Sequence, residues 1–353
     1  MPIVSLNVIK ILFLLALSSA VTVFWTPALT YFLYKYKMWR KQPKSKSIDN
    51  GPIPYFQKFH KEKEVNVPRM GGVLIWLTPI FIIIIFALLP KLFHSPWLDK
   101  LNFLSRGQTW LPLATLFFAS LLGFFDDIFQ IFGKGKYAEK GIKFTRRLIL
   151  ILIIGLIGAY WFYFKLGWSM IHIPGAGDLE IGLWYLPLFI LVMLACWSGG
   201  VIDGLDGLAG GSFAIMFSAF SIIAFSQMQY NLAAFCAVIV GAILGFLWFN
   251  IPPARFYMGE TGIIGLTSTL AIVAFLTDSI LVLPIIGGLL VIESGSVIIQ
   301  LISKKIFKKK VFLSAPIHHH FQAKGWSEAK ITMRFWIIGM ILAVIGIAIR
   351  LLG

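Results

Sequence analysis

Five carboxylates lie where long apolar segments of the chain end, and their chemistry suits a site for phosphates and a metal ion. They are Asp126, Asp127, Asp203, Asp206 and Glu260. The chain has only 15 acidic residues among 353, and 58% of its residues are hydrophobic. A carboxylate at the edge of hydrocarbon is energetically costly, so such acids usually hold a metal ion or relay charge. The first question is whether three separate loops bring these acids to one place.

Two of the acids are adjacent, in the segment GFFDDIF at residues 123–129. Neighbouring side chains on a helix diverge by about 100°, so only one of Asp126 and Asp127 can enter a given pocket directly. Mg²⁺ prefers a few carboxylates, with substrate phosphates completing its shell, so a magnesium site beside a phosphate is one interpretation. The alternative is structural, with the two acids capping the turn and pairing with Lys134 or Lys136.

The segment IDGLDGLAGG at residues 202–211 spaces Asp203 and Asp206 three residues apart. This spacing predicts that both acids lie on one helical face. The glycines of the segment would let a ligand approach the backbone closely. An Asp-Gly pair alone is only a turn signal, so a plain turn is the alternative. The repeated DGLDG pattern between two apolar segments favours a binding loop.

A proline-rich loop, FNIPPARFYMGETG at residues 249–262, leads into Glu260 at an expected helix start. An acid in the first helical turn is favoured by the helix dipole, so capping alone would explain Glu260. Asn250, Arg255 and Tyr257 add an amide, a cation and an aromatic face beside it. That combination suits a bound nucleotide better than it suits a cap.

Three successive histidines, His318, His319 and His320, lie in the segment APIHHHFQAKGW at residues 315–326. They lack the glutamate and the helical spacing of a zinc-binding HExxH helix. In extended backbone His318 and His320 would share one side, and His319 would face the other. Imidazole nitrogens can donate hydrogen bonds to phosphate oxygens, so we favour a substrate contact over a plain surface loop.

A basic loop enters the second apolar segment through VNVPRMGG at residues 65–72. Its Arg69 could contact a phosphate, or it could simply mark the cytoplasmic edge of the membrane. The residue type supports both interpretations equally.

The elements that position these residues are predicted to be membrane-spanning helices. Charged residues make up only 13% of the chain, and the mean hydropathy is +0.85. A span needs roughly 20 apolar residues, so we expect an all-α polytopic membrane protein with about ten transmembrane helices. Their centres fall near residues 20, 81, 120, 156, 192, 217, 240, 270, 292 and 342. No long polar stretch interrupts them, so residues 1–353 are expected to form a single integral membrane domain.

Charge is distributed unevenly among the loops of a chain whose net charge is +16. Residues 35–69 hold ten Lys and Arg against three acids, residues 133–147 hold six, and residues 304–334 hold eight. The positive-inside rule therefore places these loops in the cytoplasm and both termini outside. With this topology, all five carboxylates fall on the cytoplasmic side.

Taken together, the motifs resemble those of the polyprenyl-phosphate N-acetylhexosamine-1-phosphate transferase superfamily, and within it the phospho-N-acetylmuramoyl-pentapeptide transferase family. The resemblance covers nearly the whole chain, with the motifs in family order and ten spans as the family has. Its most discriminating part is Pro316–Phe321 followed by Lys324–Trp326. Relatives that use other sugar nucleotides carry a different histidine pattern there.

The resemblance implies roles for particular residues by their position. The implied catalytic residues are Asp126, Asp127, Glu260, His319 and His320. The implied substrate-binding residues are Arg69, Arg147, Asp203, Gly204, Leu205, Asp206, Asn250, Tyr257 and His318. Among these, the DGLDG loop would recognise uridine and Tyr257 would stack on uracil. The implied cofactor is Mg²⁺, with Asp127 and Glu260 as its protein ligands.

The implied reaction transfers phospho-MurNAc-pentapeptide from its UDP-linked precursor to undecaprenyl phosphate, giving lipid I and UMP in peptidoglycan synthesis. The expected location is the bacterial inner membrane, with the active site facing the cytoplasm. Besides its two substrates, the expected partner is membrane lipid, with a homodimer as an open alternative and no nucleic acid. One alternative is a sibling transferase that uses UDP-GlcNAc or another UDP-N-acetylhexosamine. A secondary transporter is a weaker alternative, because broken helices with acids mark ion pathways but no internal repeat is evident.

Three positions depart from the family pattern. Glu260 stands where the family has an aspartate, Gly200 where it has an asparagine, and Arg69 where it has a threonine. Arg69 is closer to the sibling transferases, whereas the histidine motif favours the muramoyl-pentapeptide family. Arg147 falls where the family usually has a lysine.

Overall fold

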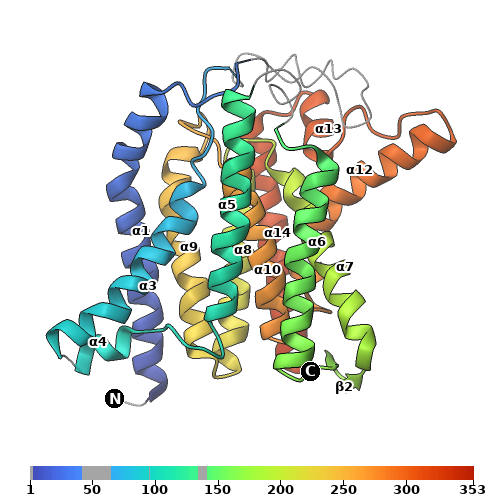
Figure 1. Ribbon diagram of the computed structural model, residues 1–353. Coiled ribbons are helices and arrows are strands. Elements are labelled where there is room, and N and C mark those ends of the chain that lie inside the picture. Colours follow the sequence, from blue (N-terminus) through green and yellow to red (C-terminus); the bar gives the residue numbers. More distant parts are fainter. Residues whose placement is uncertain (1–2, 42–64, 95, 134–140) are drawn as a thin grey trace.

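Long helices make up nearly all of the computed structural model, which describes residues 3–41, 65–94, 96–133 and 141–353 (Figure 1). In this part of the chain, nine helical segments are long and apolar enough to cross a membrane. They are α1 (Ile3–Lys35), α3 (Val73–Phe93), α5 (Trp110–Phe132), α6 (Phe144–Tyr160) with η2 (Trp161–Lys165), α7 (Tyr185–Ser198) with η3 (Gly182–Trp184) and η4 (Gly199–Ile202), α8 (Leu208–Ser226), α9 (Tyr230–Asn250), α10 (Gly259–Leu276) and α14 (Glu328–Leu352). A helix pairs its own backbone N–H and C=O groups, and it must do so in a membrane because hydrocarbon offers them no hydrogen-bond partners. The expected all-α membrane architecture is confirmed.

The tenth expected span, centred near residue 292, is divided into two helices. α11 (Leu283–Ile286) is a single turn, and α12 (Gly288–Ile306) follows after Gly287. α12 carries Glu293 and two lysines in its last turn, so it is less apolar than the other long helices. It leans outward from the bundle in Figure 1. The remaining elements are short: α4 (Pro96–Leu101), α13 (Ile317–Ala323) and a hairpin of β1 (Met170–Ile173) with β2 (Gly177–Glu180).

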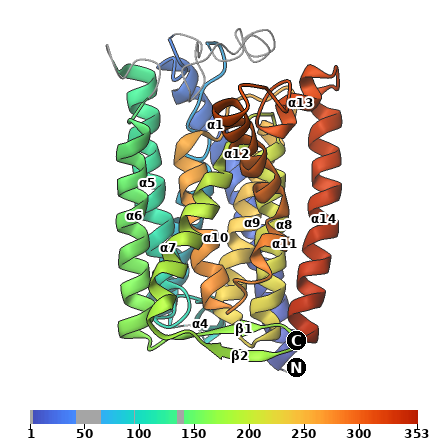
Figure 2. The ribbon, with the colours of Figure 1, turned by 90° about the vertical axis from the view of Figure 1, so that its right-hand side faces the viewer.

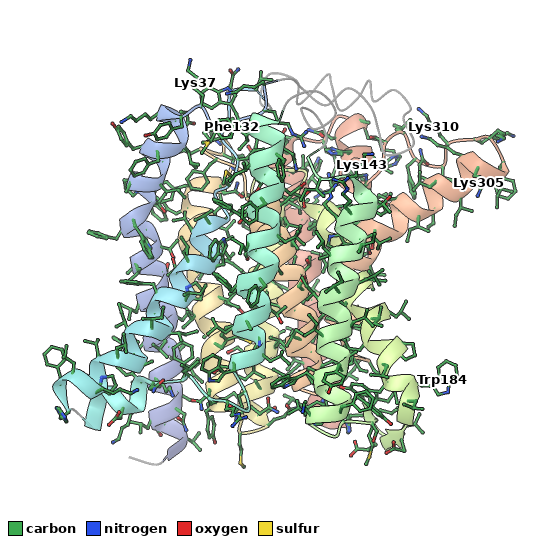
Figure 3. The ribbon with its side chains drawn as sticks, in the orientation of Figure 1. Lys37, Phe132, Lys143, Trp184, Lys305 and Lys310 are labelled. Atoms are coloured by element: carbon green, nitrogen blue, oxygen red, sulfur yellow. The ribbon has the colours of Figure 1, made fainter. Side chains whose placement is uncertain are left out.

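The two ends of the bundle differ in charge, as the loop composition predicts. Lys37, Lys143, Lys305 and Lys310 lie at one end, and Trp184 lies at the other (Figure 3). The start of α1 and the C-terminus both lie at the end opposite these lysines, and the C-terminus is beside the hairpin (Figures 1 and 2). The start of α1 and the C-terminus therefore share one side, which requires an even number of crossings. The nine long helices of the described residues fit this arrangement if α11 and α12 together count as the tenth crossing.

α10 forms the centre of the bundle and is buried along almost its whole length. It packs mainly against α5, and also against α7 and α3. A helix that is apolar on every face belongs in an interior, and the composition of α10 fits this position. The closest crossing with α5 is at Gly123, where a Cβ would overlap the backbone of Glu260 and Thr261. Because Gly123 has no side chain, α5 can approach the start of α10 this closely.

Replacing Gly123 by alanine is expected to lower the free energy of unfolding by about 1–3 kcal/mol, because backbone atoms on both helices must move apart. The thermal midpoint in detergent should fall, and any residual activity should fall with it. Gly295→Ala is the matched control, since a Cβ there meets nothing within 4 Å in the middle of α12. An unchanged midpoint in Gly123→Ala would show that the crossing is not tight.

Candidate active site

The first turn of α10 is where the predicted loops meet. The two carboxylate oxygens of Asp127 accept hydrogen bonds from the backbone N–H groups of Glu260, at 3.2 Å, and Thr261, at 3.0 Å. Asp127 reaches this turn from α5 and is fully buried. A carboxylate at a helix N-terminus satisfies orphan donors and complements the dipole. Asp127 therefore does cap a helix, but the helix is α10 and not the turn at the end of its own segment, which the structural interpretation had assumed.

Asp126 is also fully buried but faces a different set of partners. Its Oδ2 accepts a hydrogen bond from Gln130 Nε2 at 2.9 Å, and its Oδ1 accepts one from the backbone N–H of Ile142. The two adjacent acids thus diverge, as the 100° step of a helix predicts. The alternative partners considered above, Lys134 and Lys136, lie outside the described residues.

Arg147, from the first turn of α6, bridges two of the acids. Its Nη1 lies 2.8 Å from Glu260 Oε1 and 3.4 Å from Asp126 Oδ2. The Glu260 side chain is 26% exposed, whereas Asp126 and Asp127 have no exposed side-chain surface. Among these three carboxylates, Glu260 is therefore the one that solvent or a ligand can reach.

Arg69 reaches the same place through pairing between two loops. The backbone N–H of Tyr257 donates to the carbonyl of Pro68, and the N–H of Gly71 donates to the carbonyl of Tyr257, both at 2.8 Å. This pairing sets Arg69 Nε 3.6 Å from Asp127 Oδ1. Arg69 thus faces the acids, which favours the phosphate-contact interpretation over a simple membrane-edge residue.

The DGLDG segment is a series of turns between η4 and α8, so the prediction that Asp203 and Asp206 share one helical face is wrong. The 3₁₀ turn ends at Asp203, whose backbone leaves the helical region, and Gly207 takes a positive φ of 76° just before α8 begins. Asp203 accepts a hydrogen bond from the backbone N–H of Gly259. Asp206 Oδ2 instead accepts one from Ala254 at 3.1 Å. Two acids, Asp127 from α5 and Asp203 from the DGLDG segment, therefore hold the start of α10.

Burial raises the pKa of Asp203 to about 7, although Arg69 and the Gly259 N–H oppose the shift. Because the unfolded chain would release this proton near pH 4, the folded state holds an extra proton between about pH 4 and 7. The free energy of unfolding should therefore fall as pH rises through that window and then level off. Asp203 opposes folding most strongly above pH 7, by at most about 4 kcal/mol.

Asp203→Asn is thus expected to raise the thermal midpoint relative to the unmodified protein at pH 8 and to leave it nearly unchanged at pH 4.5. Midpoints of both proteins across this range in one detergent measure the difference. Asp99→Asn, an exposed acid in α4 at the other end of the molecule, is the control. A midpoint difference that does not change with pH would contradict the raised pKa.

Asn250 connects two of the predicted binding segments. Its Oδ1 accepts a hydrogen bond from the N–H of Gly207 at 3.1 Å, and its Nδ2 donates to the carbonyl of Phe256 at 2.8 Å. The side chain is buried, so both ends of its amide are used to hold the DGLDG segment against the proline-rich loop. Tyr257, in that loop, and Gly204 are half-buried, and Leu205 is buried. Substrate contacts by these residues stay predictions.

The three histidines lie in α13, so the alternation of extended backbone does not apply to them. His318 is fully buried, with its Nδ1 2.9 Å from Glu293 Oε2, and its ring packs directly against Gly204. His319 Nδ1 lies 3.0 Å from Gln322 Oε1. His320 Nδ1 accepts a hydrogen bond from Leu313 N–H, and partial burial together with Lys324 lowers its pKa. The motif therefore reaches the DGLDG segment chiefly through His318.

Two residues of this site, Gln130 and Glu293, were not predicted from the sequence. Gln130 connects Asp126 to Arg40, whose guanidinium donates to Gln130 Oε1. Its position four residues after Asp126 on the same helix face was a usable signal. Glu293 lies within an apolar run, and no spacing could have paired it with His318, 25 residues later. Gly200 also differs from the family, and a Cβ there would press on Ile263 of α10.

The arrangement brings four carboxylates and two guanidinium groups together around one helix start. This excess of negative charge, with Glu260 partly exposed, suits a divalent cation, which would in turn attract phosphates. A model of the family described as "Glycosyl transferase family 4" matches residues 109–278, which include α5 to α10 and all five carboxylates. The fold and the site thus define a membrane glycosyl transferase.

Similarity to individual proteins extends over the whole chain. It is 37% identical to a phospho-N-acetylmuramoyl-pentapeptide-transferase of Bacillus subtilis over 96% of this chain and 98% of the relative. A protein of the same name from Geobacillus sp. is 37% identical over 95% of this chain and 96% of the relative. One from Lactiplantibacillus plantarum is 39% identical over 82% and 86%. The chain belongs to the phospho-N-acetylmuramoyl-pentapeptide-transferase family.

Proposed function

We propose that the chain transfers phospho-MurNAc-pentapeptide from its UDP-linked precursor to undecaprenyl phosphate, with lipid I and UMP as products. The name that its relatives share supports this reaction. The observation that carries the proposal is that acids and arginines from five separate segments converge at the first turn of α10. These residues are Asp126, Asp127, Asp203, Glu260, Arg69 and Arg147.

The reaction depends more on stabilising negative charge on the phosphates than on a strong base. An oxygen of the lipid phosphate attacks the sugar-linked phosphorus, and the bond from that phosphorus to UMP breaks. The attacking phosphate is anionic at neutral pH, so positioning contributes more than proton removal. We favour a direct single displacement, with Asp126 or Asp127 beside the attacking group. Arg69 and Arg147 would stabilise the negative charge that develops on the leaving phosphate.

Magnesium fits the donor set of this site. Mg²⁺ is commonly bound through one or two carboxylates, while substrate phosphates and water complete its shell. Glu260 and Asp127 would supply the protein ligands, because one is reachable from solvent and the other is fixed beside it by the α10 backbone. When bound, the ion neutralises charge on the pyrophosphate as its bond breaks.

Substrate recognition is proposed for the segments around these acids. The DGLDG segment and Tyr257 would bind the uridine, and Asn250 and His318 would hold that segment in place. His319 and His320 would contact phosphate oxygens. The site would face the cytoplasm of a bacterium with the protein in its inner membrane, because the lysine-rich end would attract anionic lipid and nucleotide.

One reconstitution tests the proposal. Purified protein in detergent is supplied with undecaprenyl phosphate, Mg²⁺ and UDP-MurNAc-pentapeptide, and UMP and the lipid product are measured. We expect UMP release that requires both the lipid and Mg²⁺. Turnover with UDP-GlcNAc instead would identify a sibling transferase. No turnover with either nucleotide sugar would remove the support for a transferase and favour a transporter.

A further inference from the structure

A second group of potential ligands lies at the opposite end of the molecule from the carboxylate site. His172 of β1, Asp178 of β2 and Asp278 after α10 each offer one ligand atom, and these atoms all lie within 4.8 Å of one another. The three residues come from two strands and one interhelical loop. Figure 2 shows the hairpin crossing the base of the bundle beside the C-terminus.

The hydrogen bonds of His172 prepare one of its ring nitrogens for a cation. Nε2 lies 2.6 Å from the backbone carbonyl oxygen of Gly353, which can only accept a hydrogen bond, so Nε2 carries a proton. Nδ1 lies 2.8 Å from Asp178 Oδ1, also an acceptor, so without a metal a proton lies between these two atoms, and a bound cation would replace that proton. A ring N–H donated to a backbone carbonyl is the usual outer contact of a metal-binding histidine.

The third member, Asp278, is held beside the hairpin by the main chain. The backbone N–H of His172 donates a hydrogen bond to Asp278 Oδ1 at 3.2 Å. Two carboxylates, one from β2 and one from the loop after α10, therefore lie next to the His172 ring, and a divalent cation would balance their negative charge.

We propose that His172, Asp178 and Asp278 bind a divalent transition-metal ion of the zinc type. One imidazole with two carboxylates suits zinc better than magnesium or calcium, which prefer oxygen ligands only. The ion connects the hairpin to the loop that follows α10. A two-stranded hairpin is marginally stable alone, and this one has four residues in each strand and few buried side chains. The site is structural and independent of the proposed transferase reaction.

Zinc binding to the full-length protein tests the proposal, with the protein purified without a polyhistidine tag. Bound zinc is counted after gel filtration, and thermal midpoints are recorded with and without added Zn²⁺. We expect the unmodified protein to bind one more equivalent than Asp178→Asn or His172→Gln, and to gain a higher midpoint with zinc that these variants lack. Loss of an outer-shell partner weakens metal sites by about 10–100-fold, so loss of a ligand should weaken zinc binding at least as much.

The controls separate this site from other zinc ligands in the chain, such as the α13 histidines. His94→Gln and Asp99→Asn, both exposed, should retain the zinc and the midpoint shift. Asp178 has a 59% exposed side chain, so its replacement leaves the fold intact, and UMP release should be unchanged. Equal zinc content and equal midpoint shifts in the unmodified protein and both site variants would overturn the proposal, as would a protein that binds no zinc.

Discussion

Replacing Asp127 by asparagine is expected to lower kcat for UMP release by about 10²–10³-fold while the protein still folds. Asparagine keeps an acceptor oxygen for one of the two backbone donors, Glu260 N–H or Thr261 N–H, so much of the α10 cap survives. It removes the negative charge beside Arg69 that the proposed metal and phosphate chemistry needs. UMP release with saturating substrates measures the effect.

The stability of the Asp127→Asn variant distinguishes a catalytic role of Asp127 from its role as a helix cap. Loss of a cap costs about 1 kcal/mol, so the thermal midpoint of Asp127→Asn should fall only modestly. Asp99→Asn should match the unmodified protein in both measurements, since this exposed acid lies at the other end of the molecule. Near-normal UMP release from folded Asp127→Asn would reduce the role of Asp127 to that of a helix cap.

The second large effect is expected at Glu260, where the charge matters more than the length of the side chain. Glu260→Gln should lower kcat by about 10²–10⁴-fold and raise the Mg²⁺ concentration needed for half-maximal rate. Its amide can still accept a hydrogen bond from Arg147, so the 2.8 Å contact need not be lost. Rates across a Mg²⁺ titration separate loss of a ligand from loss of the arginine contact.

Glu260→Asp is the matched conservative change, because the resemblance implies an aspartate at this position. The shorter acid keeps the charge and can still bind a metal, so activity should stay largely intact. The partly exposed position leaves room for this adjustment. Equal losses in Glu260→Asp and Glu260→Gln would show that Glu260 serves to position Arg147 and does not bind the ion.

Hydrophobic runs were sufficient to predict most of the fold. A membrane span requires about 20 apolar residues, and nine of the ten expected segments are such helices in the described part of the chain. The tenth is broken at Gly287, and its acid Glu293 is matched by His318 in the folded protein. The apolar run gave no sign of that partner.

Local conformation was less predictable than the spans. Asp203 and Asp206 have helical spacing, but glycines turn the chain there and send the two acids to different backbone donors, Gly259 and Ala254. The histidines were treated as extended chain, yet His318 to His320 lie in a single helical turn. Short segments of this kind are decided by the donors and acceptors around them.

The helical membrane class and the end of the molecule that carries the five acids could be predicted without a structure, because they follow from hydrophobic length and from charge in the loops. The family could be predicted from the motifs. The folded structure was needed to show that Asp127 and Asp203 hold the start of α10 and that Arg147 lies between Asp126 and Glu260. Those contacts join residues up to 134 positions apart, and close packing at Gly123, rather than any local pattern, brings them together.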